Sequence, residues 1–167
     1  MKKLILVALV VAGAWWYFVG GRNLSEEHVR GFYRGLEVAT LERKPENLCS
    51  LLADDFESTG TMAIGGQSRT DTQNKTRTCE AYRGLYESWE KLGEKMGGTL
   101  QLDSTYTIHS VAISPDNKTA TVDISSSLDV AGSIMNIRSR STDTLIRRNG
   151  KVLLLRSEGK GSIGSGS

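Results

Sequence analysis

In this 167-residue sequence, Asp143 and Arg156 are the two ionisable side chains that are best placed to take part in a chemical reaction or to bind a ligand. Both lie in apolar, alternating stretches on either side of Asn149-Gly150, a dipeptide typical of a two-residue β-hairpin turn. Counting outward from that turn places Asp143 opposite Arg156, on the face that also carries the apolar residues. A carboxylate on an apolar face must be paired or must change its pKa.

Two interpretations of this pair remain open. In the first, Asp143 and Arg156 form a buried structural ion pair that neutralises itself. In the second, Asp143 is the acid or base of a proton-transfer site, or clamps a ligand, and Tyr106 is a hydrogen-bond donor. An arginine opposite the carboxylate favours the structural pair, because such catalysis requires an unpaired carboxylate. Tyr33 and Tyr82 are further candidate donors, although tyrosines at helical or strand spacing are usually core residues.

The same counting predicts a polar patch within the core face of the sheet. If residues 131–134 form the preceding loop, one face carries Val122, Ile124, Leu128, Met135, Ile137, Leu145 and Leu154. The polar residues on or beside this face are the predicted pocket lining: Tyr106, Ser126, Ser139, Ser141, Asp143 and Arg156. The opposite face carries Asp123, Asp129, Arg138 and Arg140, an arrangement typical of solvated cross-strand charge pairs.

Cys49 and Cys79 lie on separate predicted helices, and the chain has no other cysteine. In an oxidising compartment they can form a disulfide, which would close a loop of about 30 residues and stabilise the fold by roughly 3 kcal/mol. The alternative is two buried free thiols acting as small apolar groups. His28 and His109 are the only histidines and lack nearby acids or cysteines, so we predict no metal site. No glycine-rich phosphate loop or other cofactor motif occurs, and we predict no cofactor.

Helical periodicity occupies the first part of the chain. We predict helices over residues 25–43, 45–56 and 72–95, with a short strand and a glycine-containing loop over residues 57–71. Ser25 precedes two glutamates, which is typical of a helix start. Pro45 suits the first position of the second helix, whose apolar stripe continues to Phe56.

From residue 99 the pattern changes to the alternation of β-strands. Four strands are predicted, over residues 99–113, 119–131, 134–148 and 151–158. Residues 159–167 are rich in Gly and Ser and are expected to form a flexible tail.

The first 21 residues predict a membrane segment. Two lysines precede Leu4–Gly20, a run without charge that is just long enough to cross a thin hydrocarbon core. Aromatic residues at positions 15–17 suit the membrane interface. Because positive residues stay in the cytoplasm, we expect residues 1–3 inside, residues 4–21 as an anchor and the rest outside. The alternative is a cleavable signal peptide, cut near Ala12-Gly13-Ala14.

Besides the order of the predicted helices and strands, three short stretches of sequence are informative: Leu51–Phe56, Thr119–Val122 and Asp143–Lys151. Together with that order, they resemble the nuclear transport factor 2-like superfamily, which includes the SnoaL-like proteins and the ketosteroid isomerases. The resemblance covers about residues 25–158. It implies an α+β fold in which three N-terminal helices pack in a strongly curved antiparallel sheet, forming a cone with an open-ended pocket. None of the runs is a catalytic motif, so the activity stays open.

Charge and compartment narrow the function classes. Lys2 and Lys3 account for the formal net charge of +2, so residues 22–167 are neutral and are not expected to bind nucleic acid. The leading hypothesis is a non-catalytic binding or assembly domain, because the resemblance includes tethered periplasmic subunits of secretion machines. The alternatives are a pocket enzyme of the isomerase or dehydratase type and a small-ligand carrier.

The expected location is the bacterial inner membrane, crossed once, with the domain facing the periplasm or the cell exterior. The expected partners are the membrane itself, through residues 4–20, and either a protein of the cell envelope or a small apolar ligand. The sheet also offers a surface for a homodimer.

Overall fold

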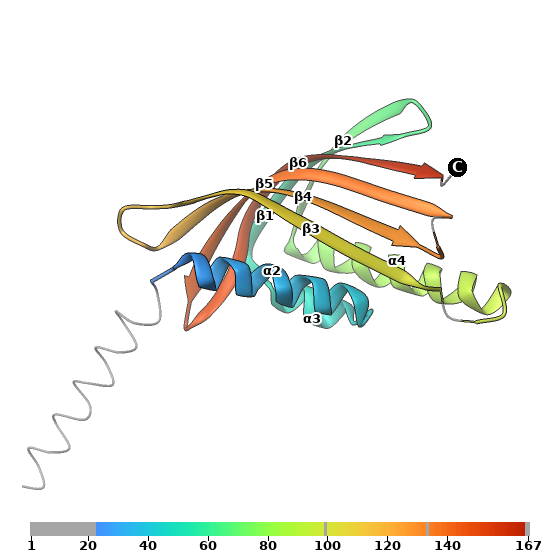
Figure 1. The fold of residues 1–167 in the computed structure, drawn as a ribbon, viewed down its shortest axis with the longest axis horizontal. Helices are drawn as coiled ribbons and strands as arrows, with labels where there is room; N and C mark the ends of the chain where they lie inside the picture. The colour runs from blue at the N-terminus through green and yellow to red at the C-terminus, as the bar shows by residue number, and fades with distance from the viewer. Residues whose placement is uncertain (1–22, 99, 133, 166–167) are drawn as a thin grey trace, which may run out of the picture.

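In the computed structural model, which describes residues 23–98, 100–132 and 134–165, three helices lie on one side of a curved six-stranded sheet (Figure 1). The helices are α2 (Glu26–Leu41), α3 (Pro45–Ser50) and α4 (Lys75–Lys95). The strands are β1 (Leu52–Ile64), β2 (Gln67–Asn74), β3 (Leu102–Ile113), β4 (Thr119–Val130), β5 (Met135–Arg148) and β6 (Lys151–Ser165). The predicted α+β class and the curved sheet are therefore confirmed.

The two long helices begin at side-chain caps. Ser25 accepts a hydrogen bond from the His28 backbone N–H at the start of α2, as the sequence predicts. Asn74 accepts one from the Arg77 N–H, so α4 begins a few residues later than predicted. The predicted anchor, Leu4–Gly20, lies outside the described residues, and none of the described helices is long and apolar enough to cross a membrane.

The prediction of a second helix extending to residue 56 is wrong. α3 ends at Ser50, and Leu52 and Phe56 are buried residues of strand β1. Their spacing of four suits a helix, but Leu52 pairs in parallel with Leu154 of β6 instead. The predicted loop over residues 57–71 is largely a hairpin of β1 and β2, which turns at Gly65 and Gly66, both at positive φ.

The sheet order is β2-β1-β6-β5-β4-β3. Its neighbours are antiparallel except β1 and β6, so the sheet is mixed and the wholly antiparallel prediction is wrong at this one pair. β1, the first strand of the chain, lies between β2 and β6. The N-terminal half of the chain is thereby hydrogen-bonded to the predicted C-terminal meander.

The Gly/Ser-rich tail prediction is also wrong. β6 continues to Ser165, because it pairs with β5 on one side and with β1 on the other. Gly159 is required there by space: a Cβ would lie 2.7 Å from the Arg140 carbonyl oxygen and 2.8 Å from the Ser141 Cβ. Hydrogen bonding on both sides thus orders a segment whose composition is typical of a flexible tail. Residues 166–167 lie outside the described part of the chain.

The hairpin prediction at Asn149-Gly150 is confirmed. Both residues have positive φ, 52° and 78°, as a type I′ turn requires. Arg148 faces Lys151 and Leu145 faces Leu154, in the predicted register. The predicted pairing of β4 with β5 is confirmed as well, from Val130 opposite Met135 to Val122 opposite Asp143.

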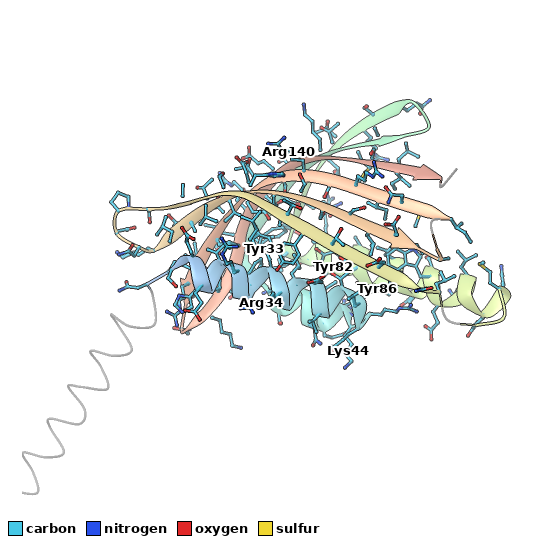
Figure 2. The ribbon with its side chains drawn as sticks, in the orientation of Figure 1. Tyr33, Arg34, Lys44, Tyr82, Tyr86 and Arg140 are labelled. Carbon is cyan, nitrogen blue, oxygen red and sulfur yellow. A yellow bond between two sulfur atoms is a disulfide. The ribbon has the colours of Figure 1, made fainter. Side chains whose placement is uncertain are left out.

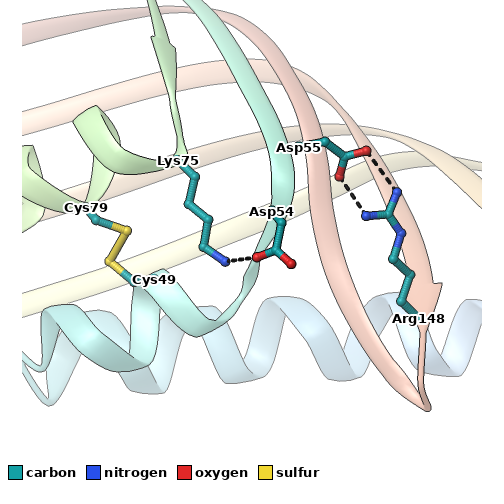
Figure 3. Close-up of polar contacts among 6 residues, drawn as sticks. All are labelled: Cys49, Asp54, Asp55, Lys75, Cys79 and Arg148. Carbon is teal, nitrogen blue, oxygen red and sulfur yellow. Dashed lines mark hydrogen bonds and ion pairs between the residues drawn. A yellow bond between two sulfur atoms is a disulfide. The ribbon is translucent and has the colours of Figure 1, made fainter.

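Three links hold the helices and the hairpin to β1 and to each other (Figure 3). The predicted disulfide joins Cys49 of α3 to Cys79 of α4, with the Cα atoms 5.6 Å apart. Arg148 donates two hydrogen bonds to the Asp55 carboxylate, at 2.7 and 2.9 Å. Lys75 donates one to Asp54 at 2.9 Å. The two ion pairs lie at the surface, so each contributes little to stability, whereas the disulfide restricts the unfolded chain.

Candidate functional site

The predicted acid, Asp143, lies in the core between the sheet and α2. It is 5% exposed, and its two carboxylate oxygens accept hydrogen bonds from different elements. The Tyr33 hydroxyl of α2 donates to Oδ2 at 2.8 Å, and the Ser157 hydroxyl of β6 donates to Oδ1 at 2.7 Å. Figure 2 shows Tyr33 between α2 and the sheet. The carboxylate is therefore satisfied by neutral donors rather than by a cation.

Burial controls the ionisation of this cluster. Removal from water raises the pKa of Asp143, and hydrogen bonds from Ser157, Tyr33 and Ser141 oppose that rise. Burial, together with the nearby Asp143 carboxylate, raises the pKa of Tyr33 as well. Burial also raises the pKa of Tyr82 to about 12, with smaller contributions from Tyr86 and Asp143. The hydroxyls of Tyr33 and Tyr82 are therefore neutral at physiological pH.

The predicted Asp143–Arg156 pair is wrong. Leu145 still pairs with Leu154, but Thr144 pairs with Arg156, so Leu155 is an extra residue in β6. A bulge of one residue turns every following side chain to the other face. Ser157 consequently faces Asp143, and Arg156 points outward to Glu57, with its Nη2 3.3 Å from Oε2.

We expect Arg156→Ala to change the free energy of unfolding by less than about 0.5 kcal/mol, because an exposed ion pair contributes little. The side chains of Arg156 and Glu57 are 57% and 64% exposed. Urea unfolding of Arg156→Ala, Asp143→Ala and the double variant measures both the effect and the coupling. A coupling free energy of more than about 1 kcal/mol would contradict the register described here.

The other predicted pocket residues share one face of the sheet but do not enclose Asp143 in a cavity. Tyr106, Ser126 and Ser139 form a cross-strand row on β3, β4 and β5. The Tyr106 ring packs on Tyr33, with centroids 5.8 Å apart, and the Ser126 and Ser139 hydroxyls are 2.7 Å apart. Only Ser141 acts on the carboxylate, through a hydrogen bond. Tyr106, Ser126 and Ser139 line a groove across β3 to β6, and Tyr106 also lines a cavity between α2 and β3, but Asp143 lines neither.

The two histidines lie apart from this cluster. His28 contacts its own helix cap, with Nδ1 2.8 Å from the Ser25 Oγ. His109 sits at a bulge in β3, is exposed, and places Nε2 2.8 Å from the Ser125 Oγ. Within the described ranges, no group of three His, Cys, Asp or Glu residues could hold a metal ion.

Sequence reasoning missed the true partners of Asp143. Tyr33 was one of three candidate donors, and its helical spacing with Val29 indicated only a core residue. Ser157 follows the bulge, and a single extra residue in a strand leaves no mark on an alternating pattern. The sequence did indicate Asp143 itself, because it is a carboxylate at a position where the alternating pattern expects an apolar residue.

Comparison with solved structures decides the fold. No protein-family model matches the chain, and no curated protein is significantly similar to it in sequence. A scytalone dehydratase-like protein from Novosphingobium aromaticivorans superposes with a TM-score of 0.61 at 11% identity, covering 85% of this chain and 87% of that one. An NTF-2-like protein of unknown function from Shewanella oneidensis gives 0.53 at 15% identity, covering 82% and 99%. The chain has the nuclear transport factor 2-like fold.

The nuclear transport factor 2-like fold alone does not assign an activity to Asp143. A ketosteroid isomerase-like protein from Erwinia carotovora also superposes, with a TM-score of 0.51 at 15% identity, covering 83% of this chain and 95% of that one. The proteins that share this fold thus include ones described as dehydratase-like, isomerase-like and of unknown function. At such low sequence identities the similarity shows the fold alone, so the function depends on this chain's own residues.

Proposed function

We propose that this chain is a membrane-tethered, extracytoplasmic binding domain and that Asp143 holds its fold together rather than carrying out a reaction. The observation behind this proposal is that both oxygens of the buried carboxylate are occupied by Tyr33 and Ser157. A general base needs access to a substrate proton within hydrogen-bond reach. Asp143 is 5% exposed, so its carboxylate is largely closed to a substrate.

Two features support the extracytoplasmic part of the proposal. The charge-free run Leu4–Gly20 behind two lysines has the length and flanking residues of an anchor. The Cys49–Cys79 disulfide is the kind of bond that persists in oxidising compartments and is rare in the cytosol. An anchor holds the domain at one surface, which raises its effective concentration for a ligand or partner found there.

A second function, proton transfer on a small apolar substrate, is favoured by one observation. Asp143 is buried without a cation, and burial raises its pKa, as occurs for acids and bases at active sites. In this alternative an opening between α2 and the sheet admits the substrate, and Tyr106 or Tyr33 donates a hydrogen bond to it. Turnover that disappears in a stably folded Asp143→Asn variant would establish the enzyme over the binding domain.

The tether predicts that the full-length protein stays in the membrane fraction when it is produced in a bacterial host. Leu9→Arg with Val10→Arg should release it from the membrane or block its export, because each arginine costs about 2.5–3.5 kcal/mol at the centre of the segment. The matched control is Val38→Arg with Leu41→Arg, which places the same charges on exposed positions of α2. N-terminal sequencing of the membrane-free fraction is the decisive measurement. A mature protein beginning at Trp15 or later would reject the tether.

The binding role is tested by capture from membranes with the anchor intact. Captured small molecules and proteins are identified by mass spectrometry, with wild-type and Asp143→Asn protein compared. A structural Asp143 predicts the same captured set for both, because the asparagine side chain retains an oxygen that accepts from Tyr33. Loss of a small molecule in the variant alone would place Asp143 in a ligand site instead.

A further inference from the structure

A groove of about 530 Å³ crosses four neighbouring strands of the sheet. Its lining consists of three consecutive residues from each of β3, β4, β5 and β6: Thr105–Thr107, Ser125–Ser127, Arg138–Arg140 and Lys160–Ser162. The volume lies within the range of small-molecule binding sites, about 300–1,000 Å³.

The strand register places this groove on the face turned away from the helices. Tyr106, Ser126, Ser139 and Gly161 pair across the strands in one row, and the side chains of the first three are on the core side. The next core-side residues along the strands, such as Ile108 and Ile137, do not line the groove, whereas the outward-facing residues on both sides of the row do. The backbone of this row therefore forms the floor of the groove on the outer face of the sheet. The outward-pointing side chains on both sides of the row form its two walls. In Figure 2, Arg140 and Tyr33 lie on opposite sides of the sheet.

The walls carry three cations and no acid. Arg138 and Arg140 lie two residues apart on β5, about 6.7 Å along the strand, and Lys160 is the cross-strand partner of Arg140. All three are exposed, and none forms an ion pair within 4 Å with the described residues. The remaining outward positions carry hydroxyl groups: Thr105, Thr107, Ser125, Ser127 and Ser162.

The predicted charge pairs on this face are wrong, and the correction explains why the arginines are available. Asp123 accepts hydrogen bonds from Thr142 at 2.8 Å and Ser110 at 3.2 Å, and Asp129 accepts one from Asn136. The Thr142 bond is the main reason that the pKa of Asp123 is lowered, and the Ser110 bond and the charge of Arg140 lower it further. Neutral donors thus satisfy the acids, and the guanidinium groups stay directed to solvent.

We propose that this groove binds a phosphate-bearing ligand, with Arg138, Arg140 and Lys160 as its anion contacts. Guanidinium groups bind phosphate oxygens through two parallel hydrogen bonds, lysine adds a point charge, and hydroxyls donate to the remaining oxygens. The inference rests on the proposed function in one respect, since it gives the binding domain a ligand class. The phosphate can belong to a soluble molecule or to a lipid headgroup, and the experiment separates the two.

Isothermal titration calorimetry of the full-length chain in a neutral maltoside detergent tests the inference. One arm titrates inorganic pyrophosphate, and the other titrates mixed micelles containing phosphatidic acid. Saturable binding is expected in at least one arm, and the arm that binds identifies the source. Arg138→Gln with Arg140→Gln should weaken that binding at least about tenfold, because both guanidinium groups and their charge-assisted hydrogen bonds to the phosphate are lost.

The matched control is Arg69→Gln with Arg77→Gln, which removes the same charge from exposed residues outside the groove. This variant should bind within about twofold of wild type, and circular dichroism should show that both variants are folded. Equal weakening in the control, unchanged binding in the groove variant, or no binding in either arm up to about 10 mM would each overturn the inference. Detergent calorimetry does not depend on the anchor or on Asp143, so a failed titration rejects the groove and leaves the tests of the tether and of catalysis intact.

Discussion

Asp143→Ala is expected to lower the free energy of unfolding by about 2–4 kcal/mol at pH 4, whereas Asp143→Asn changes it by less than about 1 kcal/mol. Alanine leaves the hydroxyls of Tyr33 and Ser157 without their acceptor in the core. Each unsatisfied buried donor costs about 1–3 kcal/mol. Asparagine keeps an oxygen for Tyr33, and its amide can donate to the Ser157 hydroxyl. Urea unfolding of the three proteins at one pH provides the comparison.

The same series has a defined pH dependence. Burial raises the folded-state pKa of Asp143 above the unfolded value of about 3.9. The folded state therefore binds the proton more tightly, and stability falls as the pH rises through the folded-state pKa. Wild type should lose this contribution as the pH rises above the unfolded-state pKa of about 3.9 and through the raised folded-state pKa, while Asp143→Asn should show a flatter profile. A wild-type profile that rises with pH more steeply than that of Asp143→Asn would contradict the raised pKa.

Tyr33→Phe tests the geometry of the cluster independently. Removing the hydroxyl deletes one donor to the carboxylate without opening a large cavity. In a double-variant cycle with Asp143→Ala, we expect a coupling free energy of more than about 1 kcal/mol, because the two groups contact each other directly. If Asp143→Ala costs no more than Asp143→Asn, and the coupling is below about 0.5 kcal/mol, the carboxylate does not hold the fold together and the catalytic alternative gains support.

Loss of the Cys49–Cys79 disulfide should lower the free energy of unfolding by about 3–4 kcal/mol. The bond closes a loop between residues 30 positions apart and restricts the unfolded chain more than the folded one. Cys79 is also 8% exposed, so the linkage fastens α3 to α4 from within the core. We expect the midpoint of urea unfolding to fall in the presence of a reductant, and to fall equally in Cys49→Ala with Cys79→Ala.

The double alanine variant is also the control for the reductant. Its unfolding midpoint should be the same with and without reducing agent, because no bond remains to break. Thiol counting in denatured, non-reduced wild-type protein should find no free cysteine. Full alkylation of both cysteines without a reductant would show that the bond is absent in the isolated protein.

Local patterns predicted the elements that depend on nearby residues alone. The cap at Ser25 and the type I′ turn at Asn149-Gly150 are determined within a few residues, and both were predicted correctly. Pairing of β4 with β5 followed from the short loop between them and from the alternation of apolar residues. The α+β class and the disulfide partners also followed, because only two cysteines exist and the periodicity changes once along the chain.

The contacts of the candidate site were decided by pairing between distant segments. Nothing near Leu155 marks it as a bulge, yet that one residue moves Arg156 to the outer face and brings Ser157 to Asp143. Nothing in residues 159–165 predicts a strand, but the chain hydrogen-bonds there to β1 and β5 together.

The sequence by itself therefore determined the start of α2, the hairpin at Asn149-Gly150 and the burial of Asp143, since caps, turns and alternation act over a few residues. Only the tertiary structure decided what Asp143 contacts and which cations form no ion pair with the described part of the chain. A strand alternates with a period of two, so one extra residue reverses every later side chain, and whether that residue is accommodated depends on the pairing of the strand with its neighbours.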